Sequence, residues 1–183
     1  MRRRAVLVST VLLVAVLAVV LSAGRTTYPR REPLGERFPS VAGTSLAGAE
    51  VRIPEDFEGA PVLLLVGYDQ DTQFDLDRWL LGLHDGGVTV AVREVPTIPG
   101  MVPRMISGTI DAGMRSGIPE EDWGAVVTVY ADAARIAEFT GNAVPLPGRI
   151  VLLDAAGRVA FFHDDGYSVG TLERLRARLA ELR

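Results

Sequence analysis

The stretch PVLLLVGY, residues 61–68, decides how this chain folds. A run that is apolar at nearly every position is typical of a strand in the centre of a sheet, covered on both faces. Five polar residues, DQDTQ at 69–73, follow it, and apolar side chains then recur at helical spacing as far as Leu83. We therefore predict a helix over about 72–84, ended by two glycines. A strand followed by a helix is half of a βαβ unit, which favours an α/β fold.

The rest of the chain alternates between strand-like and helix-like segments. Apolar residues at every second position predict strands, and apolar residues three or four apart predict helices. The closing segment is the clearest helix, because Leu172, Leu175, Leu179 and Leu182 share one face. The other predicted elements are a hairpin over 45–54, strands over 88–95 and 125–130, a helix over 103–117 that Gly108 and Gly113 break or loosen, a helix over 133–139, and a hairpin with strands over 149–154 and 158–162.

This order of elements resembles the thioredoxin superfamily, in particular its peroxiredoxin-like branch and exported relatives. The closest local match runs from Val144 to Phe161: a proline loop, an apolar strand, a glycine turn and a return strand. In that family a cis-proline precedes the strand and faces the active site. Pro145 and Pro147 are the candidates here, although counting back along the strand gives Gly148. The resemblance implies a thioredoxin-like domain over 38–183, with a central mixed sheet flanked by helices.

The chain contains no cysteine. By the layout of the family, the redox cysteines belong between Tyr68 and the following helix, where this sequence has residues 69–73. Thiol-disulfide exchange needs a thiolate that attacks sulfur, and neither a carboxylate nor an amide can replace it. The redox activity that the resemblance would imply is therefore excluded. Disulfides, zinc-thiolate sites and iron-sulfur clusters are excluded for the same reason.

The N-terminus has the pattern of an export signal. Three arginines at positions 2–4 precede an apolar run over 5–21, which would span roughly 26 Å as a helix at about 1.5 Å per residue. Residues 1–24 are thus either a cleaved signal peptide or a retained signal anchor. Either alternative predicts an extracytoplasmic domain in the periplasm or cell envelope, because the arginines stay inside. The polar, proline-containing segment 25–37 is predicted to be a linker.

The charge balance narrows the choice of partner. The chain has 19 basic and 23 acidic residues, and three of the basic ones belong to the N-terminal signal. The exported part is therefore acidic and has no basic block, so a nucleic-acid partner is not expected. The inner membrane, or another membrane or exported protein, is the expected partner.

The loop at 69–73 is the predicted binding site. It lies at the carboxyl end of a central strand and the amino end of a helix, where α/β proteins bind ligands. Asp71 or Thr72 is expected to cap that helix. The resemblance adds the proline loop, which in relatives grips an extended polypeptide, so we predict a non-redox protein that binds or scaffolds a membrane-associated partner. The predicted binding residues are Asp69, Gln70, Asp71, Thr72, Gln73, Pro145, Pro147 and Gly148.

The alternative is a metal- or small-ligand-binding domain, or a carboxylate-dependent enzyme. Five residues could form an oxygen-rich cation site if the last strand brought all of them to the same end of the sheet. No catalytic residue, cofactor or resident metal is assigned, because the serines lack a G-x-S-x-G setting and the chain has only two histidines. The residues of this alternative are Asp69, Asp71, His163, Asp164 and Asp165.

Overall fold

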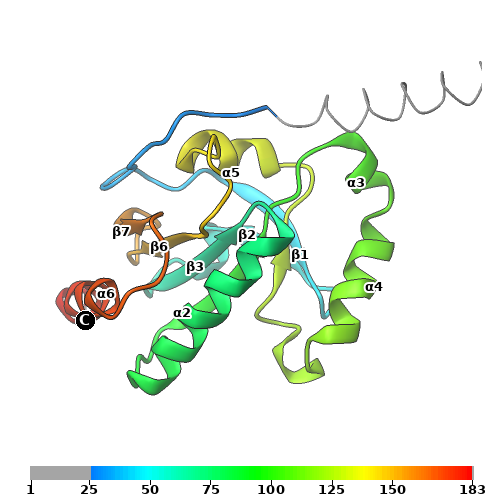
Figure 1. The fold of residues 1–183 in the computed structure, drawn as a ribbon. Helices are drawn as coiled ribbons and strands as arrows, with labels where there is room; N and C mark the ends of the chain where they lie inside the picture. Colours follow the sequence, from blue (N-terminus) through cyan, green and yellow to red (C-terminus); the bar gives the residue numbers. More distant parts are fainter. Residues whose placement is uncertain (1–25, 183) are drawn as a thin grey trace, which may run out of the picture.

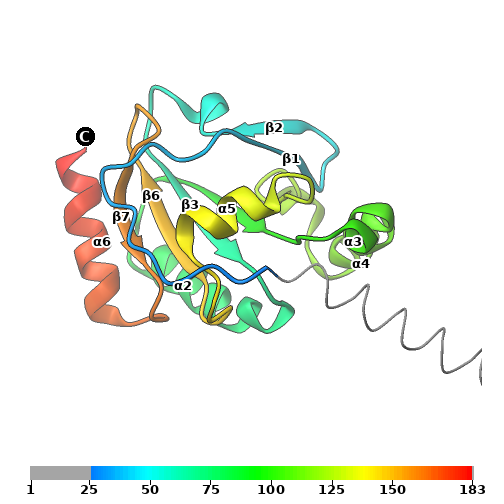
Figure 2. The ribbon, with the colours of Figure 1, turned by 90° about the horizontal axis from the view of Figure 1, so that it is seen from above.

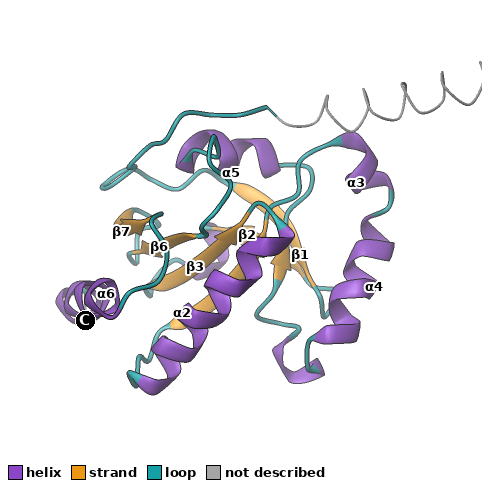
Figure 3. Cartoon of the chain, viewed as in Figure 1, coloured by secondary structure: helices purple, strands orange, loops and turns teal. Residues whose placement is uncertain are grey.

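The computed structural model describes residues 26–182 and shows seven strands in two sheets with helices around them (Figures 1 and 3). The order of elements is the one expected from the sequence. The predicted signal or anchor lies outside the described residues, and none of the helices within them is long and apolar enough to cross a membrane. The strands are β1 Val41–Ser45, β2 Glu50–Ile53, β3 Val62–Gly67, β4 Ala91–Pro96, β5 Val127–Thr128, β6 Arg149–Leu153 and β7 Val159–His163; the helices are α2 Gln73–Asp85, α3 Met101–Met105, α4 Ser107–Gly117, α5 Ala133–Thr140 and α6 Val169–Glu181.

The central strand is β3, as predicted. It pairs in parallel with β4 and antiparallel with β6 in a mixed sheet of order β4-β3-β6-β7. A second sheet has the order β2-β1-β5, and isolated parallel bridges from Glu94 to Val126 and from Thr97 to Val129 join it to β4. The predicted strand over 125–130 is therefore shortened to two paired residues between these bridges.

The β3 run is apolar throughout because each of its faces meets a separate core. Leu63 and Leu65 pack with Trp79 of α2 and with leucines of α6. Val62, Leu64 and Val66 face the opposite way, toward α5 and the β1–β2 hairpin. Figures 1 and 2 show this layering, with α2 and α6 on one side of the larger sheet and α5 on the other.

Several other predicted elements differ from the structure in their bounds. The hairpin expected over 45–54 begins earlier, because its first strand is Val41–Ser45. The helix expected over 103–117 is two helices, α3 and α4, which break at Ile106, and α3 includes Pro103. The helix expected from Thr72 begins as a 3₁₀ turn over Gln70–Thr72 before α2. The strand expected from residue 88 begins at Ala91, because the turn after α2 extends further.

Residues 26–38, here called the strap, lie along the domain. Gly35 N–H donates to the Val159 carbonyl at 2.8 Å, and Val159 N–H donates to the Glu36 carbonyl at 2.9 Å. The strap thus covers part of the outer edge of β7, and Figure 2 shows it running from α5 past β7. The predicted linker over 25–37 is therefore in contact with the folded domain through most of its length.

One glycine of α2 is needed for packing, which gives a first prediction. A Cβ on Gly82 would lie 2.6 Å from the Tyr167 hydroxyl and ring, which packs edge-on against Trp79. We expect Gly82→Ala to lower the free energy of unfolding by about 1–3 kcal/mol through overpacking. Gly113→Ala in α4, where nothing lies within 4 Å, is the matched control and should raise it by about 0.5–1 kcal/mol. Urea unfolding of both variants would check this, and an equal response would contradict it.

Candidate functional site

The two loops predicted to form the binding surface are in contact. A Cβ on Gly148 would lie 2.5 Å from Leu76 Cδ2 and 3.2 Å from Thr72 Cγ2, so the proline loop packs directly on the start of α2. Thr72 is buried beneath this contact, and within residues 26–182 its hydroxyl has no hydrogen-bond partner. We call the outer side of this junction, residues 69–74 and 145–148, the cis-proline surface.

Pro147 is the cis-proline of this loop. The Leu146–Pro147 peptide is cis, whereas Pro145 follows a trans bond. Counting back along the strand gave Gly148, which is wrong by one residue. A count of residues does not contain the conformation of the loop that precedes the strand.

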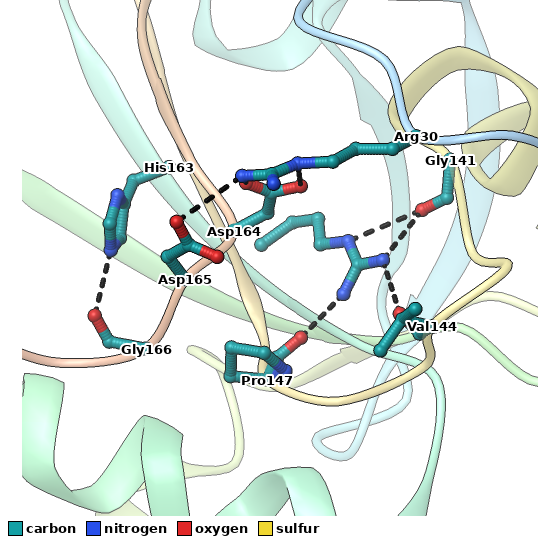
Figure 4. A network of polar contacts seen from close by, with 9 residues as sticks. Arg30, Gly141, Val144, Pro147, His163, Asp164, Asp165 and Gly166 are labelled. Carbon is teal, nitrogen blue, oxygen red and sulfur yellow. Dashed lines mark hydrogen bonds and ion pairs between the residues drawn. The ribbon is translucent and has the colours of Figure 1, made fainter.

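Arg149 holds the proline loop from below. Its side chain is only 3% exposed, and its guanidinium donates to the carbonyls of Gly141, Val144 and Pro147. Figure 4 shows these three carbonyls converging on one point. No carboxylate pairs with Arg149 in the described part of the chain, and burial lowers the pKa of its guanidinium. The loop is therefore shaped around a buried cation.

Tyr68 closes this network from the side of β3. The Arg149 guanidinium lies over its ring, 5.4 Å from the centroid, and its hydroxyl contacts the Thr140 hydroxyl. Burial raises the pKa of Tyr68 to about 12, so the phenol stays neutral at physiological pH. The end of the central strand is thus tied to both α5 and the proline loop.

Asp75 forms the second tie between the loops. It is buried in the first turn of α2, where its carboxylate accepts from Gly148 N–H at 3.3 Å and from Tyr167 N–H at 2.9 Å. One side chain therefore joins α2, the proline loop and the segment before α6. The sequence prediction missed Asp75 and Arg149. The one sequence feature that could have drawn attention to them is that each is a charged residue followed directly by an apolar one.

The polar rim of the site is formed by residues 69–73. The expectation that Asp71 or Thr72 caps the helix was wrong: Asp69 accepts from Asp71 N–H at 3.1 Å, and neither expected side chain makes a capping bond. Asp71 is exposed. Gln73 donates to the carboxylates of Asp77 and Glu94, at 2.8 and 3.3 Å.

Glu94 gives a prediction about pH. Burial, opposed by the Gln73 hydrogen bond, raises its pKa above the ordinary value. The unfolded chain therefore loses this proton at lower pH than the folded chain, so the ionised group costs stability as pH rises above about 4.3. We expect Glu94→Gln to be more stable than the wild type at pH 7 and to match it near pH 4. Urea unfolding at both values checks this; a less stable variant at pH 7 would contradict it.

Apolar side chains and free backbone groups lie beside this rim. Phe74 of α2 is 71% exposed and Val144 is 67% exposed. Leu146, which precedes the cis-proline, is also exposed, and neither its N–H nor its carbonyl has a partner within residues 26–182. The surface therefore offers a donor, an acceptor and apolar contacts on a loop that Arg149 and Asp75 hold in place.

The residues of the alternative site are engaged elsewhere. Arg30 of the strap binds Asp164 bidentately, at 2.6 and 2.8 Å, and approaches Asp165 at 3.4 Å (Figure 4). The His163 ring contacts the Gly166 carbonyl at 2.7 Å. Among the described residues, no three or more histidines and acidic residues gather as a metal site requires, so these residues do not join Asp69 and Asp71.

Comparison with solved structures identifies the fold as thioredoxin-like. A thiol peroxidase from Chromobacterium violaceum matches 86% of this chain and 93% of its own length, with a TM-score of 0.57 and 16% identity. BsSco, of the Sco family of cytochrome c oxidase assembly proteins, matches 82% of this chain and 98% of its own length, with a TM-score of 0.57 and 11% identity. The exposed lipoprotein thioredoxin of Streptococcus pneumoniae matches 79% of this chain and 100% of its own length, with a TM-score of 0.54 and 14% identity. No family model and no curated protein matches the chain.

These likenesses show the fold alone, because the sequence identities are low. They confirm the resemblance inferred from the sequence. The chain is thus a thioredoxin-fold protein without cysteine, and it cannot carry out thiol redox chemistry.

Proposed function

We propose that this protein binds an extended segment of a membrane-associated or exported partner on its cis-proline surface, and so acts as a scaffold or assembly factor outside the cytoplasm. The main support is that the N–H and carbonyl of Leu146, beside cis-Pro147, have no hydrogen-bond partner among the described residues. An extended peptide can pair its backbone with such groups, while its side chains find apolar contacts on either side. Phe74 and Leu146 offer those contacts.

The fixed conformation of the proline loop also supports a binding role. Arg149 and Asp75 together fix the carbonyls and amides around Pro147, so little conformational entropy remains to be lost when a partner docks. The acidic residues Asp69 and Asp71 on the rim favour a partner segment that carries basic residues.

Two observations support the proposed location and the proposed kind of partner. The arginine-flanked apolar run over 5–21 supports export, and with it a partner in the cell envelope. BsSco, with the same fold and no close sequence relation, belongs to a family of assembly proteins. The metal or carboxylate-enzyme alternative has no comparable support, since Arg30 occupies Asp164.

Partner capture by surface variants tests the proposal. C-terminally tagged full-length protein would be crosslinked in cells, purified from detergent-solubilised membranes and analysed by mass spectrometry. We expect Phe74→Glu to reduce the captured partner about tenfold or more, the loss expected for a contact at the centre of an interface. Asp71→Arg should reduce it by a smaller factor, because a charge on the rim acts mainly on the rate of association.

Leu81→Glu is the matched control for this experiment. Leu81 is an exposed apolar residue of the same helix, 63% exposed, but it lies two turns away from the rim. It should capture as much partner as the wild type. Unchanged capture by both surface variants, with all proteins folded, would overturn the proposal.

A further inference from the structure

The start of the strap is fixed to the loop that leads into the cis-proline surface. The Thr26 carbonyl accepts from Asn142 Nδ2 at 3.2 Å, and Tyr28 N–H donates to Asn142 Oδ1 at 2.7 Å. The Tyr28 carbonyl in turn accepts from the N–H groups of Asn142 and Ala143, at 3.1 and 2.8 Å. The chain is therefore tied to the domain from its first described residue.

These bonds leave a short tether. Five residue steps separate Leu21, the last residue of the apolar run, from Thr26. A fully extended chain covers at most about 3.5 Å per residue, so this tether reaches roughly 18 Å. The polar headgroup layer on each side of a bilayer takes up about 6 Å of that distance. If residues 5–21 are a retained anchor, Asn142 lies close to the membrane surface.

The side of the domain that carries this attachment also carries exposed apolar residues. Val144 follows the Asn142 clamp by two residues. Met101 and Met105 of α3 are 77% and 78% exposed, and Ile106, at the break between α3 and α4, is 49% exposed. Figure 1 shows α3, α5 and the first described residues along the upper side of the molecule, whereas the C-terminal end of α2 lies on the lower side.

We infer that Val144, Met101, Met105 and Ile106 form a docking face that rests on the lipid bilayer in which residues 5–21 are inserted. The short tether brings this face to the headgroup layer, where long, flexible methionine side chains can bury their apolar atoms. The cis-proline surface then opens beside the membrane. This inference goes beyond the proposed function, since lipid contact and partner capture can fail separately.

Single-cysteine labelling tests the docking face, and the chain suits it because it has no native cysteine. Full-length Met105→Cys, Val144→Cys and Leu81→Cys would each carry an environment-sensitive fluorophore. The proteins would be reconstituted in vesicles of phosphatidylethanolamine and phosphatidylglycerol with nitroxide-labelled headgroups. We expect blue-shifted, strongly quenched emission at 105 and 144 and the emission of a water-exposed label at 81.

Three outcomes would overturn the inference. Equal, water-like emission at all three positions would mean that the face does not touch lipid. Failure of the full-length protein to insert would remove the anchor on which the tether depends. A blue shift at 105 and 144 that grows with the protein-to-lipid ratio and occurs without lipid quenching would mean that a second copy of the chain covers the face.

Discussion

Replacing Arg149 by methionine is expected to lower the free energy of unfolding by about 3 kcal/mol. Methionine fills much of the same volume but donates no hydrogen bond. The carbonyls of Gly141, Val144 and Pro147 would then face each other without the guanidinium that separates them. Each buried acceptor left without a donor costs about 1–3 kcal/mol, less where the loop can open to water. Urea unfolding measures the loss.

Two further arginine variants make this result specific. Arg176→Met removes an exposed arginine of α6 that pairs with Glu173, and it should change stability by no more than about 0.5 kcal/mol. Arg149→Lys keeps the charge but not the planar fork of donors, so its loss should fall between the two. An Arg149→Met protein within about 1 kcal/mol of the wild type would show that the loop does not depend on this side chain.

Asp75→Ala is expected to cost about 2–3 kcal/mol and to loosen the proline loop. The substitution leaves the N–H groups of Gly148 and Tyr167 without the carboxylate that accepts from both. Besides the loss of stability, these two amides should exchange their hydrogens faster under native conditions, because the contact that protects them is gone.

Asp77→Ala is the matched control for Asp75. It removes an exposed carboxylate two residues further along the same helix, where the Gln73 amide is its hydrogen-bond donor. We expect little change in stability and no change in exchange at Gly148. If both variants behaved alike, Asp75 would not be the link between α2 and the proline loop.

Much of the fold could be predicted from the sequence, because its clearest apolar patterns have to be buried. The apolar run at 61–68 must be covered on both faces, and the structure covers it with two cores. The leucines of α6 likewise form one buried stripe, with Leu172, Leu175 and Leu179 all inside. The glycines at 108 and 113 predicted a broken or loosened helix, but the break lies at Ile106, where the apolar pattern continues without interruption.

The sequence could place the two loops of the proposed site, but not the contacts that hold them together. Its position at the end of β3 and the start of α2 follows from the general behaviour of α/β proteins. The roles of Arg149 and Asp75 depend on backbone groups distant in sequence, and no local pattern signals such partners. The strap was missed for the same reason, since its composition suggests a linker while its hydrogen bonds go to Asn142, Val159 and Asp164.

A photo-crosslinking amino acid at position 146 tests directly whether the cis-proline surface binds a partner. It would replace Leu146 in full-length protein in living cells, with Val169 as the comparison position, because that residue is 66% exposed and lies at the start of α6. We expect one dominant adduct with a cell-envelope protein at 146, none at 169, and loss of the adduct when Phe74→Glu is added. The same adducts at both positions, or none at 146, would contradict it.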